Sequence, residues 1–217
     1  MTAQIALREA LRDIVGPAAR EHGFKGSGTN WRRSNESGDW AIVNVQSSSF
    51  SSREHLRCVI NMSVAPRPWL DWQENNLGRR PKTISESLGL YRSRLHPTGS
   101  EPGADTWWEV TGPGDAGLVA RDMADRLAAD GWTFLTALLD RERMIAQIRN
   151  RDLGMIRGQK WTGLLARAEA VMLSDHGPSH DLDRLLEVEV TEATPPQRDN
   201  AERFADWVRN RATIATT

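Results

Sequence analysis

The sequence of 217 residues contains only one cysteine, Cys58, and it lacks any apolar run of the roughly eighteen residues that a membrane span needs. A single cysteine cannot form an intrachain disulfide, so we expect a protein that is stable without one in a reducing, cytoplasmic setting. The N-terminal segment carries charges within its apolar pattern, which is not typical of a signal peptide. We therefore expect no membrane partner.

The chain also lacks an excess of charge of one sign. It holds 28 Lys and Arg against 29 Asp and Glu, a balance that argues against nucleic acid as a general partner. The distribution is uneven, because residues 1–100 hold 14 basic and 9 acidic side chains whereas residues 101–217 hold 14 and 20. An anionic ligand is therefore expected in the first half, although the same asymmetry also fits two layers that attract each other.

The sequence motifs of well-known catalytic sites are missing. There is no Gly-x-Ser-x-Gly elbow, no Gly-Lys-Ser/Thr phosphate loop and no His-Glu-x-x-His pair. Cys58 is interpreted as a buried strand residue, since no base or metal ligand lies near it in the sequence. We predict no catalytic residue, no metal ligand and no cofactor, and we favour a protein that is not an enzyme.

What the sequence does contain is a pattern of strands between helices. Apolar residues at every third or fourth position predict an amphipathic helix over residues 2–22, interrupted near Pro17. Extended runs follow at residues 31–33, 40–47 and 56–64, and further strands are predicted at 88–95 and 106–110. After Asp115, which is predicted to be an N-cap, the apolar spacing becomes helical, and one helix is predicted over residues 132–148.

These patterns predict an α+β fold. A central antiparallel sheet of about five strands is covered by an N-terminal helix and a C-terminal set of helices. We divide the chain into a core domain at residues 1–150 and a C-terminal helical extension at residues 151–217, packed on or beside the core.

The order of several short segments resembles the bacterial domain-of-unknown-function family 4304. The segments that carry the resemblance are Gly23-Phe24, Asn30-Trp31-Arg32-Arg33, Val45-Gln46-Ser47-Ser48, Ile60-Asn61-Met62-Ser63-Val64, Arg92-Ser93-Arg94-Leu95 and Trp107-Trp108. The resemblance covers about residues 5–140. It implies an α+β domain without an established activity, cofactor or set of catalytic residues.

The candidate ligand-binding residues are polar or aromatic positions of the predicted strands. They are Asn44, Gln46, Arg57, Asn61, Arg92, Arg94 and Trp107. Amide and guanidinium groups on one sheet face could recognise a carboxylate, a phosphate or the edge of a peptide. A solvated sheet face is also expected to be polar, and a slip of one residue in register would separate these side chains.

Two further residue clusters could also form a site, but the sequence supports each of them only weakly. Arg32 and Arg33 beside Trp31 and Trp40 resemble a platform for single-stranded nucleic acid, but no motif of such a fold accompanies them. The segment 175–183 gathers His and Asp residues that could hold a metal, yet a cap for the next helix explains most of it.

The sequence favours a non-catalytic interaction domain that binds a protein or a small acidic ligand through a basic, Trp-containing sheet face. One alternative is a hydrolase or nuclease that uses the polar sheet face or the His/Asp segment. Another is a toxin-neutralising or defence-associated protein. The sequence does not indicate an oligomeric state.

Overall fold

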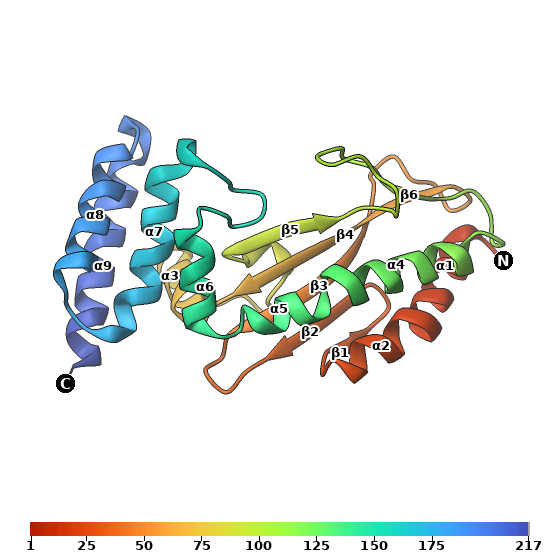
Figure 1. The fold of residues 1–217 in the computed structure, drawn as a ribbon, viewed down its shortest axis with the longest axis horizontal. Helices are drawn as coiled ribbons and strands as arrows, with labels where there is room; N and C mark the ends of the chain where they lie inside the picture. The colour runs from red at the N-terminus through yellow and green to blue at the C-terminus, as the bar shows by residue number, and fades with distance from the viewer. Residues whose placement is uncertain (217) are drawn as a thin grey trace.

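The computed structural model describes residues 1–216, except for the side chain of Gln159. One antiparallel sheet lies in the middle of the molecule, and helices pack on both of its faces (Figure 1). The predicted α+β fold is therefore confirmed. Thr217, the last residue of the predicted extension, lies outside the described residues. Within them, no helix combines the length and the apolar character that crossing a membrane requires.

The first five strands lie across the sheet in their order along the chain. They are β1 (Lys25–Ser27), β2 (Asn30–Ser34), β3 (Trp40–Ser47), β4 (Leu56–Ala65) and β5 (Tyr91–Leu95). β6 (Trp108–Val110) pairs with the beginning of β4, so β4 has three partners. In β4 only Arg57 is exposed, which agrees with its central place. The sequence pattern does not predict β1, because its residues Lys-Gly-Ser include no apolar side chain.

Four helices cover one face of the sheet, two that precede the strands in the chain and two that follow them. They are α1 (Ala3–Ala10), α2 (Gly16–Glu21), α4 (Ala116–Asp130) and α5 (Trp132–Ala137). A π-helical turn, Leu11–Val15, joins α1 to α2, and in it the Gly16 N–H donates to the Leu11 carbonyl. The sequence predicts an interruption of the helix near Pro17, and the structure shows it as this wider turn. Proline causes it because it cannot continue the regular hydrogen-bond ladder.

The other face of the sheet is only partly covered. Helix α3 (Arg67–Leu77) and the segment 84–89 lie over one end of it, where Ile42, Ala65 and Leu70 form a small apolar cluster. The segment 84–89 is fixed by two hydrogen bonds, from Arg32 Nε to the Ile84 carbonyl at 2.8 Å and from Trp69 Nε1 to the Leu88 carbonyl at 3.0 Å. The polar candidate residues lie beyond this cover.

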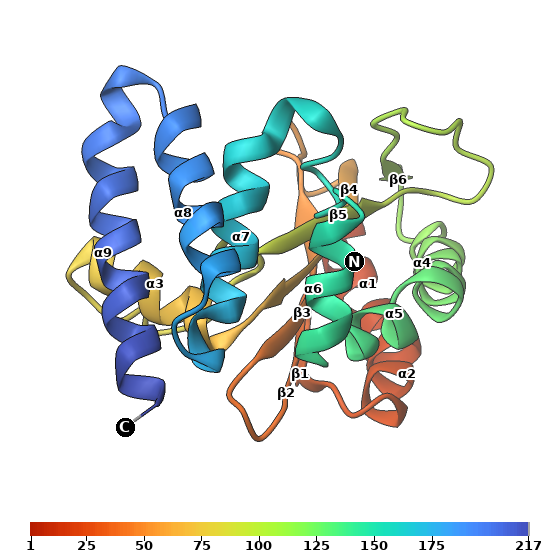
Figure 2. The same cartoon turned by 60° about the vertical axis from the view of Figure 1, so that its left-hand side comes forward.

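The remaining helices gather at one end of the sheet, beside α3 (Figures 1 and 2). They are α6 (Arg141–Arg149), α7 (Thr162–Leu173), α8 (His180–Glu192) and α9 (Arg198–Ala215). Short 3-10 turns occur at Glu86–Leu88, Gln159–Trp161, Ser174–His176 and Pro195–Gln197. Trp72 of α3 packs against Phe204 and Trp207 of α9, with ring centroids 5.0 and 5.6 Å apart.

The single helix predicted over residues 132–148 is wrong. The chain forms two helices instead, α5 and α6. Asp140 separates them, because its backbone is extended and its side chain accepts a hydrogen bond from the Arg143 N–H. An aspartate in this role begins a new helix, and the apolar spacing on either side does not reveal the break.

A closed ring of alternating charges joins the C-terminal helices to the sheet. The ion-pair ring consists of Asp39, Arg141, Asp175, Arg211, Asp71 and Arg67. It closes through the Arg67 backbone N–H, which donates to Asp39 Oδ1 at 2.7 Å. Asp39 lies in the loop before β3, so the ring connects this loop with α3, α6, α9 and the turn before α8.

Candidate functional site

The register of the sheet places three of the candidate residues in one row. Asn44 on β3 lies opposite Asn61 on β4, which lies opposite Arg94 on β5. On the other side, Asn44 Nδ2 donates to Asn30 Oδ1 on β2 at 2.9 Å. By alternation along the strands, the same face also carries Gln46, Arg57 and Arg92. We call Asn30, Asn44, Asn61, Gln46 and Arg94 the amide row.

Asn61 is the centre of this row, and its side chain is used within it. Its Nδ2 donates to Gln46 Oε1 at 2.7 Å and to Asn44 Oδ1 at 3.4 Å. Its Oδ1 accepts from Arg94 Nε at 3.1 Å, and the residue is only 8% exposed. Asn61 therefore positions its neighbours, and a ligand at the surface would meet the exposed Gln46 and the half-buried Arg94 instead.

Arg94 and Trp107 are brought together. The Arg94 guanidinium carbon lies 5.6 Å from the centre of the Trp107 ring, within the range of a cation–π contact. Asp105 holds both, accepting from Arg94 Nη1 at 3.0 Å and from Trp107 Nε1 at 3.2 Å. Trp108, the first residue of β6, is buried, while Trp107, which precedes the strand, remains half exposed. The Asp105 carboxylate occupies the anion-binding side of Arg94.

Arg57 and Arg92 do not join this group. Arg57 lies four residues along β4 from Asn61 and pairs with Glu109 of β6 at 3.1 Å. Arg92 lies at the edge strand β5, where the segment 153–155 adds a parallel bridge through Gly154. The face predicted from the sequence thus contains one connected group and two separate arginines.

A more basic surface lies around Trp40, where Arg32 and Trp40 share the face of the amide row and Arg33 lies on the opposite, helix-covered face. Two cavities of about 300 and 470 Å³ share Arg32 and Trp40 in their walls. We call this pair of cavities the Trp40 cleft. Its basic lining residues are Lys25, Arg32, Arg33, Arg67, Arg80 and Lys82. The lining includes one carboxylate, that of Glu74, and it lies 3.9 Å from Arg80 Nε.

The basic groups of the cleft differ in how far protein contacts engage them. Arg67 pairs with Asp71 at 2.6 Å, and Arg33 Nη1 donates to the His22 carbonyl at 2.7 Å. By contrast, Lys25 and Lys82 are exposed, and no carboxylate among the described residues pairs with them. The cleft therefore combines anchored guanidiniums with ammonium groups that a ligand can recruit.

The sequence predicts only part of this surface. It singled out Arg32 and Arg33 beside two tryptophans, of which Trp31 is buried on the helix-covered side and Trp40 faces the cleft. It missed the contribution of Arg80 and Lys82. Their signal is the basic run Arg-Arg-Pro-Lys at residues 79–82, in a connector without strand or helix periodicity.

The His/Asp segment at residues 175–183 and Cys58 have other roles in the structure. Asp175 is part of the ion-pair ring, and Asp183 lies 3.3 Å from Arg209 Nε. Ser179 caps α8 by accepting from the Leu182 N–H, as expected. In the described part of the chain, no three His, Cys, Asp or Glu side chains are placed to hold a metal ion. Burial raises the pKa of Cys58 to about 12, which keeps this thiol protonated at neutral pH.

Comparison with known proteins adds a family and no activity. A family model described as "Domain of unknown function (DUF4304)" matches residues 15–137, more than half of the chain. No curated protein matches significantly. No solved structure matches significantly either. The matched region includes the whole sheet, the amide row and the Trp40 cleft.

Proposed function

This chain belongs to the DUF4304 family, whose description states no activity, and we propose from its surfaces that it is a non-catalytic domain that binds an acidic ligand in the Trp40 cleft. The observation that supports the proposal is the composition of the cleft, six basic side chains and one carboxylate around a tryptophan. Guanidinium groups bind carboxylate and phosphate oxygens with two parallel hydrogen bonds, and Trp40 offers an apolar face to the body of a ligand.

The cleft is favoured over the amide row for a physical reason. The donors of Asn61 are satisfied inside the row, and Asp105 already neutralises Arg94. A ligand there would have to displace these bonds, whereas an anion in the cleft would meet lysines without a carboxylate partner. The amide row then serves to hold strands β2 to β5 in register beside the cleft.

The shape of the cleft also indicates the kind of ligand. Arg32 and Trp40 form the wall that both cavities share, with Lys25 on one side and Arg80 and Lys82 on the other. A ligand that carries two or more anionic groups can engage both sides at once. We therefore expect a di- or tricarboxylate, a diphosphate or an acidic protein segment in preference to a single small anion.

Calorimetric titration at low ionic strength tests this function. The probes are citrate, inorganic pyrophosphate and a short polyglutamate peptide, which separate a small ligand from an acidic protein segment. We expect the double substitution Arg80→Glu with Lys82→Glu to weaken the best probe about tenfold or more, because each charged hydrogen bond contributes roughly 1.5–3 kcal/mol.

The matched control is Arg8→Glu with Arg121→Glu, which makes the same change of net charge at exposed residues of α1 and α4, two helices that contribute no residue to the cleft. It should change the affinity little beyond the general effect of net charge. Equal weakening by the control and by the cleft variant would show that the anion is attracted by overall charge and would refute a specific site.

A further inference from the structure

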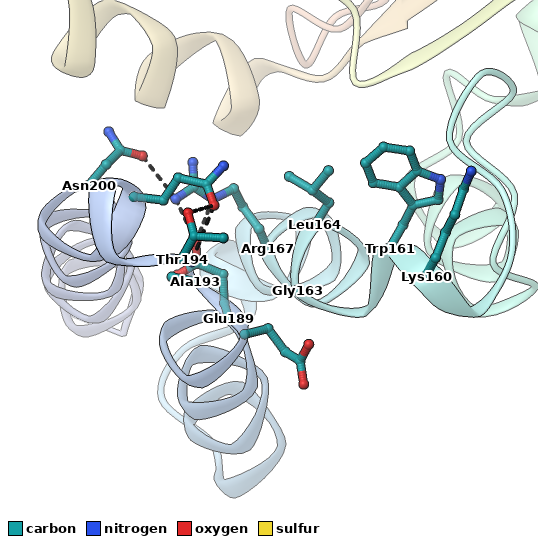
Figure 3. A pocket seen from close by; sticks show the side chains of 11 residues that line it. Lys160, Trp161, Gly163, Leu164, Arg167, Glu189, Ala193, Thr194 and Asn200 are labelled. Carbon is teal, nitrogen blue, oxygen red and sulfur yellow. Dashed lines mark hydrogen bonds and ion pairs between the residues drawn. The ribbon is translucent and has the colours of Figure 1, made fainter.

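A separate cavity of about 320 Å³ lies among the C-terminal helices, outside the residues that the family model matches (Figure 3). Its lining comes from the segment before α7, from α7, from the end of α8 and from the beginning of α9. The residues that matter are Lys160, Trp161, Leu164, Arg167, Glu189 and Glu192. We call it the Glu189 cavity.

A buried ion pair forms one wall of this cavity. Glu189 Oε1 accepts from both Nε and Nη2 of Arg167, at 2.8 and 2.5 Å. Arg167 Nη2 also donates to Asn200 Oδ1 at 2.9 Å, a bond drawn in Figure 3. The guanidinium carbon lies 4.7 Å from the Phe204 ring centre and 5.9 Å from that of Trp72. Arg167 is therefore fixed on four sides.

The other carboxylate oxygen of Glu189 is left without a partner. Glu189 is only 5% exposed, and no described residue donates a hydrogen bond to its Oε2. Burial raises the pKa of Glu189, and the charge and hydrogen bonds of Arg167 only partly oppose this effect. An unsatisfied buried acceptor costs roughly 1–3 kcal/mol, and more when it is charged. Glu189 lines the cavity, but its Oε2 exposes almost no surface, so a donor in the cavity would remove this cost only if neighbouring side chains shift to admit it.

Trp161 indicates what kind of donor fits. The Lys160 ammonium lies 5.3 Å from the centre of the Trp161 ring, so this aromatic wall already accepts an ammonium group. Lys160 is exposed, which leaves its side chain free to move aside. Glu192 adds a second carboxylate to the lining, and Leu164 adds apolar surface.

We propose that the Glu189 cavity binds a small organic cation, with a primary ammonium group on Glu189 Oε2 and an apolar body against Trp161 and Leu164. Arg167 holds the carboxylate in place through its other oxygen, and Lys160 leaves the tryptophan when the ligand enters. The volume of about 320 Å³ is at the lower end of the range for small-molecule sites, which favours a compact amine. This site is independent of the Trp40 cleft and is tested separately.

The test uses n-butylammonium as probe, with butyramide and n-butanol as neutral analogues of similar size. Binding is followed by the indole N–H signal of Trp161 in a two-dimensional NMR spectrum, assigned by Trp161→Phe. We expect a saturable shift with n-butylammonium at millimolar concentration, and none with either neutral analogue at the same ionic strength. Equal shifts with all three probes would overturn the proposal, because they would show an apolar cavity that does not recognise a cation.

Three substitutions sharpen the result. Glu189→Gln should abolish the shift, while Glu187→Gln, on the same helix but outside this cavity, should leave it unchanged. Lys160→Ala should tighten binding about two- to fivefold, since it removes the competing ammonium from the ring. Unchanged or weaker binding by Lys160→Ala contradicts the proposal, and this variant decides the question if Glu189→Gln does not fold.

Discussion

Replacement of Asp39 by alanine is the sharpest test of how the fold supports the cleft. Asp39 is 1% exposed and accepts four hydrogen bonds, one from Asn35, one from the Arg67 backbone and two from Arg141. Asp39→Ala leaves Arg141 with Asp175 as its remaining partner in the ion-pair ring. It also releases the backbone of Arg67, which lines the Trp40 cleft.

The expected loss of stability follows from this burial. Asp39→Ala should cost about 2–4 kcal/mol, because the Arg67 backbone N–H and the Asn35 amide lose a buried acceptor while Arg141 keeps only Asp175 as its carboxylate partner. Asp183→Ala is the matched control: Asp183 and Arg209 are 57% and 48% exposed, so their pair contributes at most about 1 kcal/mol. Urea unfolding followed by circular dichroism gives both values, provided that the slope with denaturant is unchanged.

A double-mutant cycle separates the loss of the attraction between Asp39 and Arg141 from the cost of leaving the Arg141 charge with one fewer partner. We expect Asp39→Ala combined with Arg141→Met to be less destabilising than the sum of the two single changes, since the pair leaves no uncompensated ion at this position. A cost of Asp39→Ala below about 1 kcal/mol, equal to that of the Asp183 control, would refute the reasoning about the ring.

Three further predictions concern single positions. Burial raises the pKa of Cys58 from 9.0 to about 12, so iodoacetamide at pH 8 should alkylate the folded protein about a thousandfold more slowly than the urea-unfolded chain, and mass spectrometry measures both rates. Burial tends to raise the pKa of Asp122, but hydrogen bonds, including one from Trp108 at 2.6 Å, outweigh it and lower the pKa below its unfolded value. The resulting stabilisation is present above about pH 4 and is lost as the pH falls through the folded pKa, so the roughly 1 kcal/mol cost of Asp122→Asn in urea unfolding should shrink with acidification. Gly154→Ala should destabilise the folded protein by about 2–4 kcal/mol in the same assay, because φ is +79° and an added Cβ would overlap a backbone carbonyl of β5. Gly158→Ala is the control: φ is +81° there too, but the added Cβ would point into open space, so the cost should be only about 1 kcal/mol.

The sheet was the part of the fold that the sequence predicted best. Alternation over residues 56–64 predicts a central strand because each second side chain must enter the core, and the turn residues before Trp40 place the neighbouring strand. Alternation also put Asn44 and Asn61 on polar faces. It did not determine that they lie opposite each other, because the register depends on the hairpin and loop geometry that sequence periodicity does not contain.

The cleft and the ring were harder to predict for a related reason. Arg80 and Lys82 reach the sheet because the following segment is tied to Arg32 through the Ile84 carbonyl, a contact between residues far apart in the chain. Asp175 likewise meets Arg141 and Arg211 only after α6, α7 and α9 have packed. Surface charges have no period of their own, so their partners follow from tertiary packing.

The central claim, an acidic ligand in the Trp40 cleft, is tested most directly by the indole N–H signals of the nine tryptophans. The protein is titrated with citrate, pyrophosphate or the polyglutamate peptide, and the signal of Trp40 is assigned by Trp40→Phe. We predict a saturable shift that is largest for Trp40 and is abolished by Arg80→Glu with Lys82→Glu. A largest shift at Trp107, beside the amide row, or no saturable shift with any probe, would contradict the account.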